Sequence, residues 1–225
     1  MLKDKTALEK WEKHCRWIHE ETQSLETAKD AHKRIERAKN DYRYFFEYYF
    51  AHYAKSPCAK WHITLANKVV SDKKINAIVE AYRGSAKSTH CIIGIPLWLM
   101  IKKEMYFLCL AGENEDKAKK LLGDVQAELQ FNQRFIADFG TQVSSGHWSD
   151  GDFVTKNDIA FMAVGLGQSP RGLRHRDKRP DVIVVSDADS KKRCKNEALV
   201  IEAAEWIQED LMGCFDGGDK SRERF

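Results

Sequence analysis

Apolar residues recur at helical spacing through the N-terminal part of the chain. Between Leu8 and Tyr49 there is neither glycine nor proline, and the apolar positions form two series. The first series is Leu8, Trp11, Cys15, Ile18 and Leu25, and the second is Ala28, Ala31, Ile35, Ala38, Tyr42, Phe45 and Tyr49. This pattern predicts an N-terminal helical extension over residues 1–56. The offset near residue 25 fits either one helix with a shifted register or two helices joined by a turn.

The extension ends in an aromatic run over residues 42–50. Such a run favours burial in a core, and stacking on nucleic-acid bases is the alternative. A helix packed on its own domain is likewise favoured over a coiled-coil partner.

After Ser56 and Pro57 the pattern changes to apolar strands that alternate with amphipathic helices. Helices are expected at about 61–70, 88–101, 116–130 and 197–212, and strands at 75–81, 105–111 and 182–185, with a strand-rich stretch over 142–164 and a polar loop over 165–181. This alternation predicts one α/β domain over residues 57–225, with a mostly parallel sheet flanked by helices.

Residues Ala81 to Thr89, which we name the Lys87 loop, stand where a predicted strand passes into a predicted helix. In that context a cluster of glycine, lysine and serine resembles a Walker A loop, whose backbone N–H groups wrap the phosphates of a nucleotide. The candidate ATP-binding residues are Arg83, Gly84, Ser85, Ala86, Lys87, Ser88 and Thr89. Lys87 takes the place that reaches the β- and γ-phosphates, and Ser88 takes the place that ligates Mg²⁺.

The Lys87 loop departs twice from the strict G-x-x-x-x-G-K-[ST] pattern. Ala81 stands for its first glycine and Ala86 for its second. An alanine at 86 is unstrained only if its φ is negative. A surface turn without a ligand is the alternative interpretation of the loop.

Acidic residues follow the second predicted strand, in the run Ser186-Asp187-Ala188-Asp189. In P-loop ATPases an acid after a buried strand organises Mg²⁺, and a neighbouring carboxylate orients the attacking water. Two assignments stay open: Ser186 at the metal with Asp187 as base, or Asp187 at the metal with Asp189 at the water. Asp187 is the essential acid in both, and turn or capping acids are the alternative.

Composition and charge narrow the class of protein. The chain has 225 residues, 43% of them hydrophobic, with a formal net charge of only +3, so any nucleic-acid surface must be local. Six cysteines without CxxC spacing indicate reduced thiols and argue against a zinc site. The N-terminus has no apolar signal region, and the longest apolar run, 91–101, is too short to span a membrane.

The segment Arg83-Gly84-Ser85-Ala86-Lys87-Ser88-Thr89 resembles the variant Walker A of the large terminase subunits of tailed phages and prophages. Residues 165–174 and the segment Arg179-Pro180-Asp181 before the strand 182–185 are similar to the motif that leads into this family's Walker B strand. Trp61-His62 and residues 107–111 match the family's layout too. The likeness covers the chain from about residue 57 onward.

The resemblance implies an ASCE (RecA-like) P-loop ATPase that uses ATP and Mg²⁺ to drive packaging of double-stranded DNA into a procapsid. It implies that the active form is a homo-oligomeric ring, pentameric in this family, and that the isolated chain can be a monomer. The ring is expected to work with a portal and a small terminase subunit. Its expected location is the host cytoplasm, away from membranes. The family also has a C-terminal nuclease domain, which this sequence does not include. A helicase-like ASCE ATPase and a degenerate nucleotide-binding assembly module are the alternatives.

Several arginines are candidates for the positive charge that phosphoryl transfer requires. Arg171 is the first candidate for a finger that acts on a neighbouring subunit's nucleotide, Arg174 and Arg176 share its loop, and Arg83 is placed to act within its own subunit. The basic runs 171–179 and 191–195 are expected beside the nucleotide site, where they either contact DNA phosphates or remain solvated.

Overall fold

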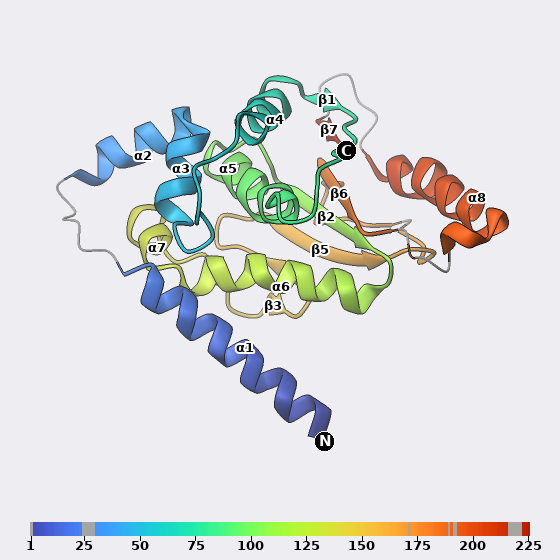
Figure 1. Ribbon diagram of the computed structural model, residues 1–225, viewed down its shortest axis with the longest axis horizontal. Coiled ribbons are helices and arrows are strands. Elements are labelled where there is room, and N and C mark those ends of the chain that lie inside the picture. Colours follow the sequence, from blue (N-terminus) through green and yellow to red (C-terminus); the bar gives the residue numbers. More distant parts are fainter. Residues whose placement is uncertain (1, 24–29, 171, 189, 191–192, 216–221) are drawn as a thin grey trace.

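A seven-stranded sheet forms the centre of the computed structural model, which describes residues 2–23, 30–170, 172–188, 190, 193–215 and 222–225 (Figure 1). The strands are β1 (Lys74–Ile75), β2 (Phe107–Gly112), β3 (Trp148–Ser149), β4 (Asp152–Val154), β5 (Ala160–Gly165), β6 (Val182–Ser186) and β7 (Glu223–Arg224). Their order across the sheet is β1-β7-β6-β2-β5-β4-β3.

The first five strands in this order, β1, β7, β6, β2 and β5, are parallel to one another. The sheet continues with β4 and β3, which pair in antiparallel fashion. The mostly parallel α/β sheet expected from the sequence is therefore confirmed. Because parallel strands run in one direction, the segments that follow β1, β2, β5 and β6 all leave from the same edge, which we name the carboxyl edge.

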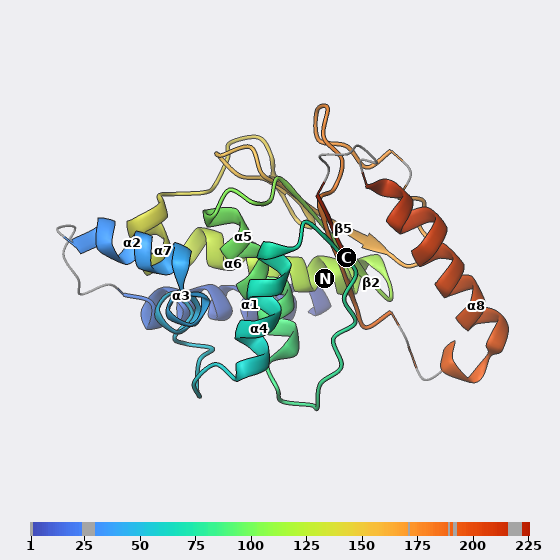
Figure 2. The ribbon, with the colours of Figure 1, turned by 90° about the horizontal axis from the view of Figure 1, so that it is seen from above.

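Alternate residues of the central strands face two different helical layers. Leu108 and Leu110 of β2 share a core with α5 (Ile95–Ile101) and α6 (Glu115–Phe131), whereas Cys109 and Ala111 pack against η4 (Trp206–Leu211). Figure 2 shows the sheet between α8 (Glu197–Glu205) and the other helices. Both faces of β2 are buried, which explains its uninterrupted apolar sequence.

The described part of the N-terminal segment contains the α-helices α1 (Leu2–Glu21), α2 (Ala31–Asn40) and α3 (Tyr42–Tyr49). The second apolar series was expected to be one helix, but it breaks at Asp41. This residue has an extended backbone, and its side chain accepts a hydrogen bond from the N–H of Tyr44 as the cap of α3. The predicted break near residue 25 falls outside the described residues.

The aromatic run 42–50 is core, as predicted. Phe45, Phe46 and Tyr49 are buried in the same cluster as Trp98 of α5, whose indole N–H donates to the carbonyl of Ala38. The helix η2 (Thr89–Gly94) contacts α3 so closely at Gly94 that only glycine fits there, since a Cβ at this position would lie 2.5 Å from the Tyr42 hydroxyl.

Four helical segments occupy nearly the predicted ranges: α4 (Lys60–Ser71), the π-helix η2 that continues into α5, α6, and α8 with η4 and η5 (Met212–Cys214). The helix α7 (Gln133–Phe139) and the 3₁₀-helix η3 (Arg193–Lys195) were not predicted. No helix among the described residues is long and apolar enough to cross a membrane. All six cysteines are free.

One predicted strand is mostly absent. Residues 75–81 were expected to form a strand, but only Lys74 and Ile75 belong to β1, and residues 76–81 have no regular secondary structure. The neighbouring strand β7 pairs with β6 through a single pair, Val182 and Arg224. The N–H of Ala77 still donates to the carbonyl of Phe225, but a cavity of about 460 Å³ lies between residues 77–79 and β6, and Ile78 is 93% exposed.

Candidate functional site

The Lys87 loop lies at the carboxyl edge and leads directly into a helix. Lys87 and Ser88 are the first residues in helical conformation, and the π-helix η2 begins at Thr89. Free N–H groups in the first turn of a helix favour bound anions, and π-helical turns occur frequently at functional sites. The helix half of the predicted strand-to-helix context is therefore present, but the strand half is not, because residues 76–81 lie outside the sheet.

The loop backbone is strained at the position of the second missing glycine. Gly84 has a φ of +87° and Ala86 a φ of +59°. An alanine is unstrained at position 86 only with a negative φ, and the structure does not meet this condition. A left-handed conformation costs a residue with a Cβ about 1–2 kcal/mol. Conformations of this kind persist where the surrounding structure holds them, often in ligand-binding sites.

The acidic residue after β6 faces the same space as the lysine. β6 extends to Ser186, one residue past the predicted end, and Asp187 follows with a φ of +49°. Lys87, Ser88, Ser186 and Asp187 together line the 460 Å³ cavity. The structure therefore brings together the predicted cation, hydroxyl and acid. Asp189, the second candidate acid, lies outside the described residues.

The polar end of this cavity has the donors that ATP and Mg²⁺ require. Lys87 supplies a cation, and the Ser88 hydroxyl and the Asp187 carboxylate are oxygen ligands of the kind Mg²⁺ prefers. Ser85 is 7% exposed, and no described residue hydrogen-bonds its buried Oγ. An unsatisfied buried hydroxyl inside the loop fits a site that a polar ligand completes. These residues thus fit a magnesium nucleotide.

Most of the other lining of the cavity is apolar. It comes from α4 through Leu65 and Val69, from Ile75 of β1, from Val79 and from the side of β6. Arg224 also lines the cavity, and its guanidinium donates hydrogen bonds to the carbonyl oxygens of Val69 and Glu104.

The candidate arginines lie in different places. Arg171 is outside the described residues, and Arg83 is exposed on the Lys87 loop. His175 and Arg176 contact the carboxylate of Asp158, at 2.7 and 3.0 Å, in the turn just before β5. The chain must cross from the carboxyl end of β5 to the amino end of the parallel strand β6, and this crossing carries Arg176 to the edge opposite the Lys87 loop.

The expectation that both basic runs lie beside the nucleotide site is therefore wrong for residues 174–178. Lys178 lies over the ring of Tyr106, which immediately precedes β2 at that same opposite edge. The other run leaves β6 at the carboxyl edge, where Arg193 begins η3. Lys191 and Lys192 fall outside the described residues.

Asp181 of the Arg179-Pro180-Asp181 segment has a structural role. It is fully buried, and its carboxyl group accepts hydrogen bonds from the N–H groups of Tyr106 and Phe107. Its carbonyl accepts one from the N–H of Arg224. One residue thereby joins the amino ends of β6, β2 and β7. Burial raises the pKa of this carboxyl to about 6, against the opposing effect of the two N–H donors.

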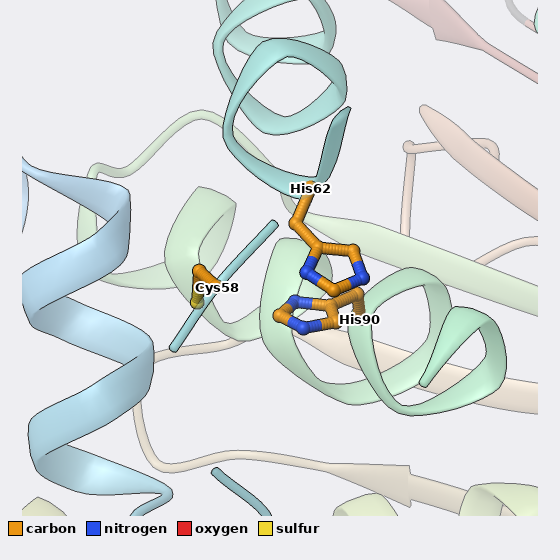
Figure 3. Close-up of side chains that lie close together, drawn as sticks. All are labelled: Cys58, His62 and His90. Atoms are coloured by element: carbon orange, nitrogen blue, oxygen red, sulfur yellow. The ribbon is translucent and has the colours of Figure 1, made fainter. Parts of the chain in front are cut away.

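A second buried group of titratable side chains lies behind the Lys87 loop. Cys58, His62 and His90 lie close together, with their potential metal-ligating atoms within 4.8 Å of one another (Figure 3). The imidazoles of His62 and His90 are stacked, with ring centroids 3.6 Å apart. Burial lowers the pKa of His90 to about 3, so this ring is neutral at physiological pH. Sequence reasoning gave no role to this group, because His90 is 28 residues beyond His62 in the chain and only the fold brings it to Cys58 and His62.

Hydrogen bonds already occupy both ring nitrogens of His62. Nδ1 accepts from the N–H of Ala59, and Nε2 lies 2.9 Å from the carbonyl oxygen of Ser85. Because a carbonyl only accepts, His62 is the neutral tautomer protonated at Nε2. With both nitrogens in hydrogen bonds, His62 has no lone pair left for a metal in this structure, and it acts as a hydrogen-bonded support of the loop.

Comparison with known proteins does not assign a function, so the assignment depends on the geometry of the site. No protein-family model matches this chain, and no curated protein matches its sequence.

Proposed function

We propose that this chain is the Mg²⁺-dependent ATPase domain of a DNA-packaging motor of the large-terminase kind, which hydrolyses ATP to drive double-stranded DNA into a procapsid. The observation that carries the proposal is the meeting of Lys87, Ser88 and Asp187 on one cavity at the carboxyl edge. Ligands of open α/β sheets bind outside this edge, between loops that follow neighbouring strands. The resemblance of the Lys87 loop and of residues 165–185 to terminase motifs supports the assignment of this ATPase to a DNA-packaging motor.

Each residue of the site has a part in this proposal. The amides of the Lys87 loop and the Lys87 ammonium bind and orient the phosphates. Ser88 and Asp187 would hold Mg²⁺, which when bound would neutralise charge on the phosphate oxygens. Asp187, or Asp189 two residues later in the sequence, would orient the attacking water. Arg171 from a neighbouring subunit, or Arg83 from the same one, adds positive charge.

A second candidate function rests on Ser186. The last residue of β6 borders the cavity with a hydroxyl where a carboxylate would hold the metal more tightly. A nucleotide-binding assembly module that binds ATP without turnover has the same loop and needs no second acid. The two candidates differ in hydrolysis, not in binding.

The test is ATP binding and steady-state hydrolysis with Mg²⁺ over a range of protein concentrations, with and without double-stranded DNA. The motor predicts turnover that rises faster than protein concentration, because subunits share sites, and that DNA stimulates. Lys87→Ala should abolish hydrolysis and weaken binding. Lys68→Ala, which removes an exposed lysine of α4, is the matched control and should behave like the wild type.

The outcomes separate the candidates. Binding without turnover supports the assembly module. Full turnover in Lys87→Ala contradicts the Walker A assignment, and a wild-type chain that binds no nucleotide contradicts both candidates.

A further inference from the structure

The conformation of the Lys87 loop depends on how one peptide group is turned. In a trans peptide the C=O and N–H groups point in opposite directions. The carbonyl of Ser85 points to His62, so the N–H of Ala86 points away from His62. No described residue accepts a hydrogen bond from this N–H. A free amide directed out of the loop is the kind of donor that binds a phosphate oxygen.

His62 is well placed to hold this peptide. It is buried, at 6% exposure, and it belongs to the first turn of α4. Its Nδ1 accepts the N–H of Ala59 at the start of that helix, which fixes the ring and leaves Nε2–H as the donor to Ser85. The side chain thus ties the helix start to a loop 23 residues further along the chain.

The ring of His62 is itself held in place by a second histidine. His90, three residues after Lys87, stacks on it, and His90 Nδ1 lies 2.7 Å from the hydroxyl of Tyr42 on α3. Tyr42 is buried in the aromatic core. A continuous series of contacts therefore runs from Tyr42 through His90 and His62 to the Ser85 carbonyl. Figure 3 shows the two stacked imidazoles.

We propose that His62 is a positioning residue of the Lys87 loop, which, by donating Nε2–H to the Ser85 carbonyl, turns the Ser85–Ala86 peptide so that its N–H binds a phosphate of the nucleotide. The inference rests on the proposed function, because it assigns the contact to nucleotide binding. It also explains why Ala86 keeps a left-handed backbone without glycine: the hydrogen bond and the buried Ser85 hold the peptide in place.

Two substitutions separate the two hydrogen bonds of His62. In His62→Asn, the side-chain oxygen takes the place of Nδ1 and still accepts from Ala59, but the side chain is too short to reach Ser85. In His62→Gln, the amide nitrogen takes the place of Nε2 and still donates to Ser85. His62→Asn should therefore weaken Mg·ATP binding by about two- to tenfold, the loss of one hydrogen bond, and His62→Gln should restore most of it.

The matched control is His52→Asn. His52 is also buried, and its Nε2 lies 2.8 Å from a carboxylate oxygen of Glu128, in contact with α6 and not with the Lys87 loop. This change should lower Tm and leave Mg·ATP affinity unchanged. If His52→Asn weakens binding as much as His62→Asn does, the effect is one of general stability and the inference is overturned.

Hydrogen–deuterium exchange of residues 82–89 in the nucleotide-free protein tests the support independently of ATP. Faster exchange in His62→Asn, with wild-type exchange in His62→Gln, confirms that His62 holds the loop even if the chain binds no nucleotide and the proposed function fails. Unchanged exchange and unchanged affinity in His62→Asn would overturn the inference.

Discussion

Ala86 and Asp187 both adopt left-handed backbone conformations, with φ of +59° and +49°, on the two segments that meet at one cavity. Ala86 precedes Lys87, and Asp187 follows the last residue of β6. Neither residue is glycine, so each conformation carries a cost. Two such residues, far apart in sequence but on segments that border one cavity, indicate a site whose backbone is shaped for a ligand rather than for stability.

Ala86→Gly should stabilise the protein. Glycine removes the left-handed cost of about 1–2 kcal/mol and adds unfolded-state entropy worth about 0.4–1 kcal/mol, so the free energy of unfolding should rise by roughly 0.5–1 kcal/mol. Urea denaturation measures this. Ala81→Gly is the matched control, because Ala81 has no positive φ and should lose stability. A loss of stability in Ala86→Gly would contradict the strained conformation.

Asp187→Asn should separate turnover from folding. Asparagine tolerates the left-handed conformation, so the free energy of unfolding should stay within about 0.5 kcal/mol of the wild type. Hydrolysis should fall about a hundredfold or more, because the charge that organises metal or water is gone. Kinetics and urea denaturation on the same sample check both statements, with the exposed Asp150→Asn as control. Recovery of activity on mixing with Arg171→Ala would place that arginine across a subunit interface.

Asp181 should make stability depend on pH. Burial raises its pKa from 3.8 to about 6 in the folded chain. Between these values the folded chain binds more protons than the unfolded one, so the stability due to this group is full below about pH 4 and is lost as the pH rises through 6. The loss should be about 2–3 kcal/mol.

Asp181→Asn keeps an oxygen that accepts from Phe107 and removes the titration. The difference in unfolding free energy between wild type and variant, measured by urea denaturation at pH 4, 5, 6 and 7, should therefore change by that amount. The exposed Asp177→Asn should show no such change. A constant difference between wild type and Asp181→Asn across this range would refute the assignment.

The elements of the central sheet could be predicted because burial imposes a pattern on them. β2, β6 and α6 have continuous or periodic apolar residues, and the meeting of Lys87 with Asp187 follows from the shared edge of parallel strands. The predicted strand 75–81 failed for the opposite reason. Its residues have strand-like composition, but a strand also needs a partner along its length, which the local sequence does not report.

Contacts across the chain also decided what sequence reasoning missed. The φ of Ala86 is fixed by the loop around it, and the support from His62 depends on a hydrogen bond to a backbone carbonyl that no side-chain pattern reveals. The placement of Arg176 required knowing how the chain crosses between β5 and β6, which depends on the order of the strands.

The N-terminal helices and the α/β domain share one aromatic core, so the two must be kept together when this domain is transferred to another protein. A chain cut to begin at residue 57 would keep every residue of the proposed ATP site, yet it would lose Phe45, Phe46 and Tyr49, which cover Trp98 and its neighbours. The surface left bare is apolar and contiguous, so such a fragment should precipitate rather than behave as a minimal ATPase. Any graft or fusion of this domain must therefore carry the N-terminal helices with it.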